Sequence, residues 1–180
     1  IISDRFHVVA QANNAFKCTR IQIMKKDKKN YKKLKNFWKL LQKYEDDLDN
    51  KKKSYSNYFK KEITQYEIVQ YLINTNPIIK ETYNIYQGII KSIKNKDSSL
   101  FIKIIEGSHN NISDYMKTTL KTYKKFKSNI INSLKYDYNN GLIEGTNNLI
   151  KCIKRISFGF KSFSHFKTRI LLVTGIYKIS

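Results

Sequence analysis

Apolar residues recur at intervals of three and four positions along most of this chain, which is the spacing of amphipathic helices. The pattern predicts one long helix from about Asp27 to Asn50. Its apolar stripe comprises Tyr31, Leu34, Trp38, Leu41, Tyr44 and Leu48. After a polar, lysine-rich break, helices are predicted over about 64–74, from Pro77 onward, over about 100–106 and over about 110–134. Pro77 suits a first helical turn, and the "NTN" before it supplies capping side chains.

The two ends of the chain give different signals. Residues 1–3 with Asp4 are predicted to be the end of a buried strand, followed by a helix. Near the other end a turn at 139–141 precedes a predicted helix over 142–156, with Gly159 as its left-handed cap and a final helix carrying Phe163. The total is about seven helices and one strand end. Because a strand must pair, we expect a sheet upstream of residue 1.

Charge changes this picture from a plain helical protein to one with a polyanionic partner. The 180 residues include 35 Lys and Arg against 14 Asp and Glu, a formal net charge of +21. A content of 41% hydrophobic residues is enough to form a core and excludes a disordered tail. Codon bias explains some of the lysine but not the shortage of acids, so we expect nucleic acid as the partner.

Cysteine spacing and hydropathy remove several other classes of protein. Cys18 and Cys152 form no C-x-x-C pattern, which argues against a zinc site or a disulfide framework and suits a reducing compartment. No apolar run is long enough to span a membrane, and no signal peptide is recognisable. We therefore expect a nucleic-acid surface and no membrane partner.

The stretch "GLIEGTNNLIKCIKR" is the first candidate for chemistry. On a helix, Glu144 shares a face with Asn147, Asn148 and Lys151. The next cations along it are Lys154 and Arg155. A carboxylate can bind a hard divalent cation, while amides and cations can contact sugars and phosphates.

Two further features of this helix help to decide whether Glu144 is a ligand or a surface charge. A glycine inside a helix costs about 1 kcal/mol, so Gly145 suggests close approach of a ligand. The predicted buried stripe comprises Leu142, Leu149, Ile153 and Ile156. Charge rows are common on exposed helices, however, and the residues alone favour a solvated face.

Asp4 is the second candidate. An acid at the carboxyl end of a buried strand lies where α/β sheets place ligand-binding groups, but the same residue could simply cap the next helix. His7 could be a base, although a single His beside an apolar run is more often structural.

Other residues give weaker signals. Tyr31, Trp38 and Tyr44 could stack on bases or belong to the core. The lysines at 51–53 and 124–127 could contact phosphates or lie on a solvated face. His109 and His165 have no partner at metal-ligand spacing.

Two motifs, "SDRFHVV" near the start and "NNGLIEGTNNLIKCIKRISFGFKSFSHFKTRI" near the end, resemble the DDE transposases of bacterial insertion sequences, in the IS-L-three-like family. The similarity includes the middle stretch "YEIVQYLINTNPIIKETYNIYQGII" and covers almost the whole chain. The chain is similar to the C-terminal part of the catalytic domain of that family.

The resemblance implies a fold that is mostly α in this chain and completes an RNase H-like α/β core with a helical insertion. Residues 1–26 would be the end of a core strand and the following helix, 27–135 the insertion, and 136–180 the helices with the final catalytic Glu. It also implies that Asp4 and Glu144 are catalytic and bind two Mg²⁺ or Mn²⁺ ions. Related transposases carry a Lys where Lys151 stands, whereas their Arg and Tyr positions are Asn140 and Asp137 here and receive no role.

The reaction implied is metal-dependent DNA strand cleavage followed by strand transfer. DNA contacts are then expected from Asn147, Asn148, Lys151, Lys154 and Arg155. The expected partners are double-stranded DNA at the transposon ends and at the target, and further copies of the full-length protein. The expected location is the cytoplasm, in association with the nucleoid.

The resemblance also sets a limit on activity. The first catalytic Asp of the family stands upstream of the "DRFHV" motif, where this sequence has only Ile1, Ile2 and Ser3, so we expect the chain to be inactive alone. The alternatives are a non-catalytic, basic DNA-binding remnant of a transposase and a purely structural helical module.

Overall fold

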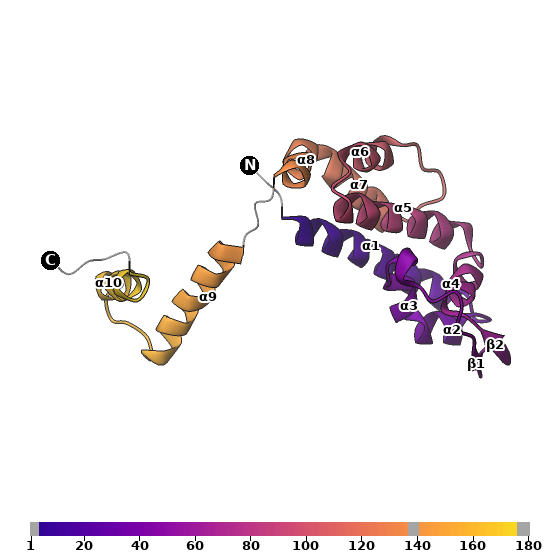
Figure 1. Ribbon diagram of the computed structural model, residues 1–180, viewed down its shortest axis with the longest axis horizontal. Helices are drawn as coiled ribbons and strands as arrows, with labels where there is room; N and C mark the ends of the chain where they lie inside the picture. The colour runs from indigo at the N-terminus through magenta and orange to yellow at the C-terminus, as the bar shows by residue number, and fades with distance from the viewer. Residues whose placement is uncertain (1–3, 137–140, 176–180) are drawn as a thin grey trace. The chain divides into compact units, whose positions relative to one another are not determined.

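The computed structural model describes residues 4–136 and 141–175, apart from the side chain of Leu142. It forms two compact units, Ile1–Asp137 and Tyr138–Ser180. The described residues are mostly helical, as predicted, with one small two-stranded sheet (Figure 1). The predicted strand at 1–3 lies outside the described residues. The boundaries predicted at 26 and 135 remain predictions, and the first unit includes both of the first two predicted segments.

Helix α1 (Arg5–Lys26) runs beside α5 (Pro77–Lys94) in the first unit (Figure 1) and also contacts α7 (Asp114–Lys125) and α8 (Lys127–Lys135). Its buried positions recur with helical spacing and include the small residues Ala12 and Ala15. Small side chains allow neighbouring helices to approach closely, so α1 can be covered on more than one side.

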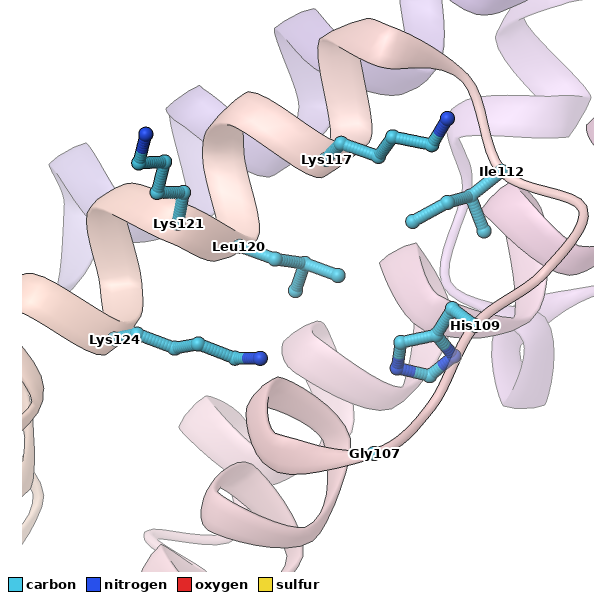
Figure 2. Close-up of a pocket in the computed structure, with 7 residues that line it drawn as sticks. All are labelled: Gly107, His109, Ile112, Lys117, Leu120, Lys121 and Lys124. Atoms are coloured by element: carbon cyan, nitrogen blue, oxygen red, sulfur yellow. The ribbon is translucent and has the colours of Figure 1, made fainter.

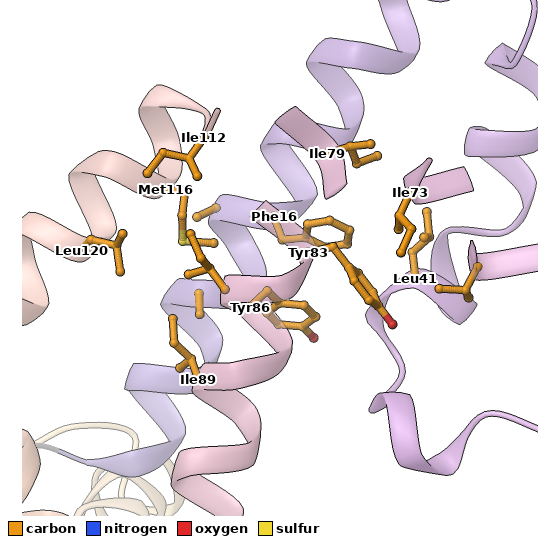
Figure 3. Close-up of a cluster of buried hydrophobic side chains, with 14 of the residues drawn as sticks. Phe16, Leu41, Ile73, Ile79, Tyr83, Tyr86, Ile89, Ile112, Met116 and Leu120 are labelled. Atoms are coloured by element: carbon orange, nitrogen blue, oxygen red, sulfur yellow. The ribbon is translucent and has the colours of Figure 1, made fainter. Parts of the chain in front are cut away.

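Aromatic packing joins α1 to α5 (Figure 3). The ring of Phe16 stacks on Tyr86, with centroids 5.2 Å apart, and meets Tyr83 edge-on at 5.7 Å. Met116 and Leu120 of α7 belong to the same buried cluster. Burying a Phe side chain contributes about 1.5–3 kcal/mol, so this contact is a main source of cohesion.

The single helix predicted from Asp27 to Asn50 is wrong. The structure has α2 (Tyr31–Asn36), α3 (Trp38–Gln42) and a 3₁₀ turn η1 (Glu45–Asp47). Leu34, Leu41 and Leu48 of the predicted stripe are buried, but Tyr31 and Trp38 are about 40% exposed.

Hydrogen bonds from α5 explain the break before η1. The Gln87 side chain accepts from the Glu45 N–H at 3.0 Å and donates to the Lys43 carbonyl at 2.9 Å. Tyr86 donates to the Gln42 carbonyl at 2.9 Å. These side chains replace helix hydrogen bonds. Hydrophobic spacing cannot predict these bonds, because their two partners lie more than 40 residues apart in the sequence.

Replacing Gln87 with Ala should lower the free energy of unfolding by about 1–3 kcal/mol, because it leaves partly buried backbone groups of Lys43 and Glu45 unpaired. Gln22→Ala, at an exposed position of α1, is the matched control and should change stability by less than about 0.5 kcal/mol. Urea unfolding of the two variants checks this. Equal midpoints would show that the break does not depend on Gln87.

A β-hairpin occupies the segment that was predicted only as a lysine-rich break. Strand β1 (Ser54–Ser56) pairs antiparallel with β2 (Lys61–Ile63), with Tyr55 opposite Glu62. Lys60, with φ of 53°, closes the turn and donates its N–H to the Ser56 carbonyl at 2.7 Å. The strands have three residues each, too short for a period-of-two pattern to stand out among lysines.

The cap predicted before Pro77 is confirmed, and the helices on either side of α5 also have side-chain caps. Asn76 caps α5 by accepting from the Ile78 N–H at 2.8 Å, and Pro77 is its first residue. Thr64 and Glu67 form a reciprocal capping box at the start of α4 (Gln65–Ile73). Asp97 caps α6 (Ser98–Glu106) through the Leu100 N–H at 2.9 Å. Each of these helices therefore begins at a residue type that commonly caps helices, and the cap at Asn76 was predicted from the sequence.

The long helix predicted over 110–134 is wrong in two respects. It starts only at Asp114, after the cap Ser113, and it breaks at Phe126 between α7 and α8. Beyond that turn, Ile130 and Leu134 are buried, and α8 contacts both α1 and α6. A straight helix would continue in the direction of α7, so the turn allows these side chains to reach the core.

The second unit contains α9 (Gly141–Ile156) and α10 (Phe163–Val173), which contact each other. The predicted helices are confirmed, but the predicted buried stripe is wrong in part. Ile153 is buried, whereas Leu149 and Ile156 are 38% and 65% exposed, and the Leu142 side chain lies outside the described residues. Two helices alone cannot cover a full apolar face, which is why these residues stay exposed.

The end of α9 has a well-defined cap. The Gly159 N–H donates to the Lys154 carbonyl and the Phe158 N–H to the Arg155 carbonyl, the hydrogen bonds of a Schellman motif. The left-handed position is Phe158, with φ of 50°, followed by Gly159 at 100°. The predicted cap is therefore one residue later than the observed left-handed residue.

Within the described ranges, no helix combines the length and the hydrophobicity needed to cross a bilayer.

Candidate active site

Asp4 is the N-cap of α1. Its backbone is extended, with φ of −67° and ψ of 125°, and its Oδ1 accepts a hydrogen bond from the Phe6 N–H at 2.8 Å. Oδ2 faces the ring of His7, with 4.0 Å to Nε2. The capping role that the sequence left open is therefore real, and it uses one carboxylate oxygen. The other oxygen is available for a ligand.

Asp4 also lines a hollow within the first unit. The cavity measures about 270 Å³ and lies where the first turns of α1 meet α7 and α8. Its other lining residues are His7, Val8, Gln11, Thr122, Tyr123, Phe126 and Ile130. Polar groups of α1 thus lie beside an apolar wall.

Tyr123 holds this part of α1 in place, a role that the sequence did not predict. Its hydroxyl donates to the Val8 carbonyl at 2.6 Å, one turn after Asp4. Burial raises the pKa of Tyr123, so the hydroxyl stays protonated and remains a donor. The two residues are 115 positions apart, so helical spacing alone could not pair them.

Glu144 lies in the first turn of α9 and is exposed. Asn147, Asn148 and Lys151 are also exposed, and on this helix they share its face, as predicted. Lys154 and Arg155 lie in the last turn of α9 and are exposed too. The helix thus presents a carboxylate, two amides and three cations to solvent.

The reason for Gly145 is not found within the described residues. A Cβ built at Gly145 would meet no atom within 4 Å, so no packing contact there requires a glycine. The expectation that a ligand approaches closely stays a prediction. Asp137 and Asn140, the two departures from the extended family signature, lie outside the described residues.

His109 has a structural environment. Its Nε2 lies 2.8 Å from the Ile104 carbonyl and therefore donates to it, and Nδ1 lies 3.6 Å from Glu81. It borders a basic hollow of about 320 Å³ on α7 (Figure 2). Of the lysines there, Lys124 extends toward the hollow while Lys121 points away, so the cations do not converge on one ligand position (Figure 2).

The three aromatic residues that could stack on bases differ in their exposure to solvent. Tyr31 and Trp38 are partly exposed, so they are not core residues. Tyr44 is half-buried, with the ammonium of Lys94 4.1 Å from its ring centroid. A hydrogen bond with Asp46 raises the pKa of Tyr44 to about 12.

Comparison with known proteins identifies the family. A family model described as "Transposase", for the IS-L-three-like DDE type, matches residues 1–170. A curated protein from Lactococcus lactis subsp. lactis, named "ATP-dependent protease", is 38% identical over 124 residues. That alignment covers 66% of this chain and 39% of the relative, so the chain spans well under half of the relative's length. No solved structure gives a significant match. The chain belongs to the IS-L-three-like family of DDE transposases.

Proposed function

We propose that this chain is part of the catalytic domain of a DNA transposase, and that it supplies two metal-binding carboxylates, Asp4 and Glu144. Transposases act on DNA, and DDE transposases generally use divalent metal ions. The observation that carries the proposal is the exposed face of α9, where Glu144 stands beside Asn147, Asn148 and Lys151 within the matched family region.

The two carboxylates fit hard divalent cations such as Mg²⁺ or Mn²⁺. Such ions prefer oxygen ligands, and Asp4 keeps one oxygen clear of its cap hydrogen bond. Glu144 forms no ion pair with any described residue, so its carboxylate is also available. Bound ions would activate a water or a 3′-hydroxyl and stabilise the leaving oxygen during phosphodiester cleavage and strand transfer.

The other polar residues of α9 are proposed to bind the DNA. Lys151, Lys154 and Arg155 can neutralise phosphates, and Asn147 and Asn148 can donate to phosphate or sugar oxygens. Two of these cations lie in the last turn of the helix, where its dipole favours positive charge. This arrangement would align the backbone of the DNA along the helix face that carries Glu144.

The exposed apolar residues of the second unit support an RNase H-like core. Ile143, Ile156 and Phe163 are 62%, 65% and 78% exposed, which is a high exposure for large apolar side chains. A sheet packed against α9 and α10 would cover them, and RNase H-like folds place helices on a sheet. The wider fold therefore remains part of the proposal.

The test uses the whole transposase and DNA that carries its own terminal repeats. We expect strand cleavage in the presence of Mg²⁺ and none in EDTA, with DNA binding in both. The alternative, a non-catalytic DNA-binding remnant, predicts salt-sensitive binding without cleavage in either buffer. Binding without cleavage would therefore refute the catalytic proposal, and the absence of binding would refute both.

A further inference from the structure

The β1–β2 hairpin and the loop before it, residues 51–63, carry a concentration of positive charge that forms no ion pairs with the described residues. Their lysines are Lys51, Lys52, Lys53, Lys60 and Lys61, and all are exposed. Among residues 4–136 and 141–175, no carboxylate forms an ion pair with any of them. Glu62 is the one acid within the hairpin. The segment therefore has a net positive charge that its own fold does not neutralise.

The loop that carries the first three lysines is pre-organised. Asp49 Oδ1 accepts from the backbone N–H groups of Lys51 at 2.9 Å and Lys52 at 2.8 Å. The Tyr66 N–H donates to the Asp49 carbonyl at 3.2 Å. The hydrogen bonds from Lys52 and Lys51 lower the pKa of Asp49, so this carboxylate is ionised and engaged with the backbone. A fixed loop loses less entropy on binding than a flexible one.

Aromatic contacts hold the other end of the hairpin against the helices. Phe59 is half-buried, with its ring centroid 5.0 Å from Tyr71 and 5.7 Å from Phe37. The Lys33 ammonium lies 4.6 Å from the centroid of the Phe59 ring, and Ile63 of β2 is buried. These contacts join the hairpin to α2, to α4 and to Phe37, the residue between α2 and α3.

Tyr55, by contrast, has no such contact. It lies in the middle of β1, its side chain is 65% exposed, and its ring packs on no other ring of the described residues. An exposed ring among cations is typical of surfaces that bind nucleic acids, where bases stack on the ring and phosphates meet the cations.

We propose that the hairpin is a DNA-binding surface, in which Lys51, Lys52 and Lys53 contact phosphates and Tyr55 stacks on an unpaired base. This inference rests on the proposed function, because it takes DNA as the partner. The hairpin would add a DNA contact to those proposed for the α9 residues, and it lies in a different part of the chain.

The distance between the hairpin and Asp4 indicates which part of the DNA the hairpin would contact. It lies at the end of the first unit where α1 ends, whereas Asp4 stands at the start of α1 (Figure 1). A helix of 22 residues is about 33 Å long. That length equals about ten base pairs of B-DNA, so the hairpin would bind roughly one helical turn away from the reacting phosphate.

The test measures DNA binding by the whole transposase in EDTA, where no cleavage can occur. The probes are a blunt duplex and the same duplex with a single-stranded overhang, each titrated at several salt concentrations by fluorescence anisotropy. Replacing Lys51, Lys52 and Lys53 together with Gln should reduce the salt slope by about two to three, because each phosphate contact contributes about 0.9. The matched control replaces Lys80, Lys91 and Lys103, exposed lysines on α5 and α6, and should leave the slope nearly unchanged.

The tyrosine is tested on the same probes. Tyr55→Ala should weaken binding to the overhang probe about tenfold and binding to the blunt duplex much less, while Tyr55→Phe keeps the ring and should bind normally. Equal slopes for the two lysine variants, or normal overhang binding by Tyr55→Ala, would overturn the inference. If the unmodified protein binds neither probe, the proposed function fails as well, so the two failures are distinguishable.

Discussion

Replacing Asp4 with Asn is expected to slow Mg²⁺-dependent DNA cleavage by about 10²–10³-fold while leaving the stability of the chain unchanged. Asn caps a helix about as well as Asp, so the hydrogen bond to the Phe6 N–H should remain. A neutral amide is a poorer ligand for a hard cation than a carboxylate, so metal binding should be lost. Cleavage of transposon-end DNA by the whole transposase, together with urea unfolding, measures both effects.

Two further variants separate capping from metal binding at Asp4. Asp4→Ala should lose cleavage and also about 0.5–2 kcal/mol of stability, because it removes the cap. Asp97→Asn makes the same chemical change at the cap of α6 and should leave cleavage normal. If Asp4→Asn cleaves DNA as well as Asp97→Asn does, Asp4 is only a helix cap.

Replacing Glu144 with Gln is expected to reduce cleavage by a similar factor of about 10²–10³. DNA binding should be equal or tighter, because removing a negative charge beside Lys151 reduces repulsion of phosphates. Two measurements on the same DNA test these expectations. The rate of single-turnover cleavage should fall, and the dissociation constant should stay equal or decrease.

Glu106→Gln is the matched control for Glu144. Glu106 also lies on a helix and is partly exposed, and its ion pair with Lys127 is a surface pair worth at most about 1 kcal/mol. The Glu106→Gln variant should cleave and bind DNA normally. Normal cleavage by Glu144→Gln would contradict its role as a ligand, and a joint loss of cleavage and binding would indicate a misfolded helix.

Local signals predicted the parts of the fold that depend on a few neighbouring residues. The cap at Asn76 and the first turn at Pro77 require only adjacent side chains, and both are correct. The helix over 142–156 was also predicted well, because polar and apolar residues alternate with its period. On this helix the shared face of Glu144 and Lys151 followed directly from the spacing.

Breaks in helices could not be predicted in the same way. The break before η1 depends on Gln87, and the turn at Phe126 depends on where α1 and α6 lie. Each is set by residues distant in sequence, and apolar spacing continues unchanged across both. The stripe of α9 failed for a related reason, because burial of Leu149 and Ile156 requires a packing surface that α10 does not provide.

For the candidate site, the metal-binding roles of Asp4 and Glu144 stay predictions, and the contacts that support these residues were not predicted from the sequence. Both possible roles of Asp4 were recognised, and the structure shows that the cap occupies Oδ1. The hydrogen bond from Tyr123 to Val8, which fixes the first turns of α1, depends on the packing of α7 against α1. The hairpin was predicted only as a lysine-rich break, because its strands are too short to show alternating polar and apolar residues.

The most direct test of the metal proposal is cleavage of the protein backbone by a bound ion. Iron(II) replaces Mg²⁺ in the whole transposase, and ascorbate with peroxide then generates hydroxyl radicals that cut the chain next to the ion. Cuts around both Asp4 and Glu144, each suppressed by excess Mg²⁺ and by either Asp4→Asn or Glu144→Gln, are the predicted result. Cuts at only one of the two segments, or cuts that Mg²⁺ does not suppress, would contradict the proposal that both carboxylates bind metal.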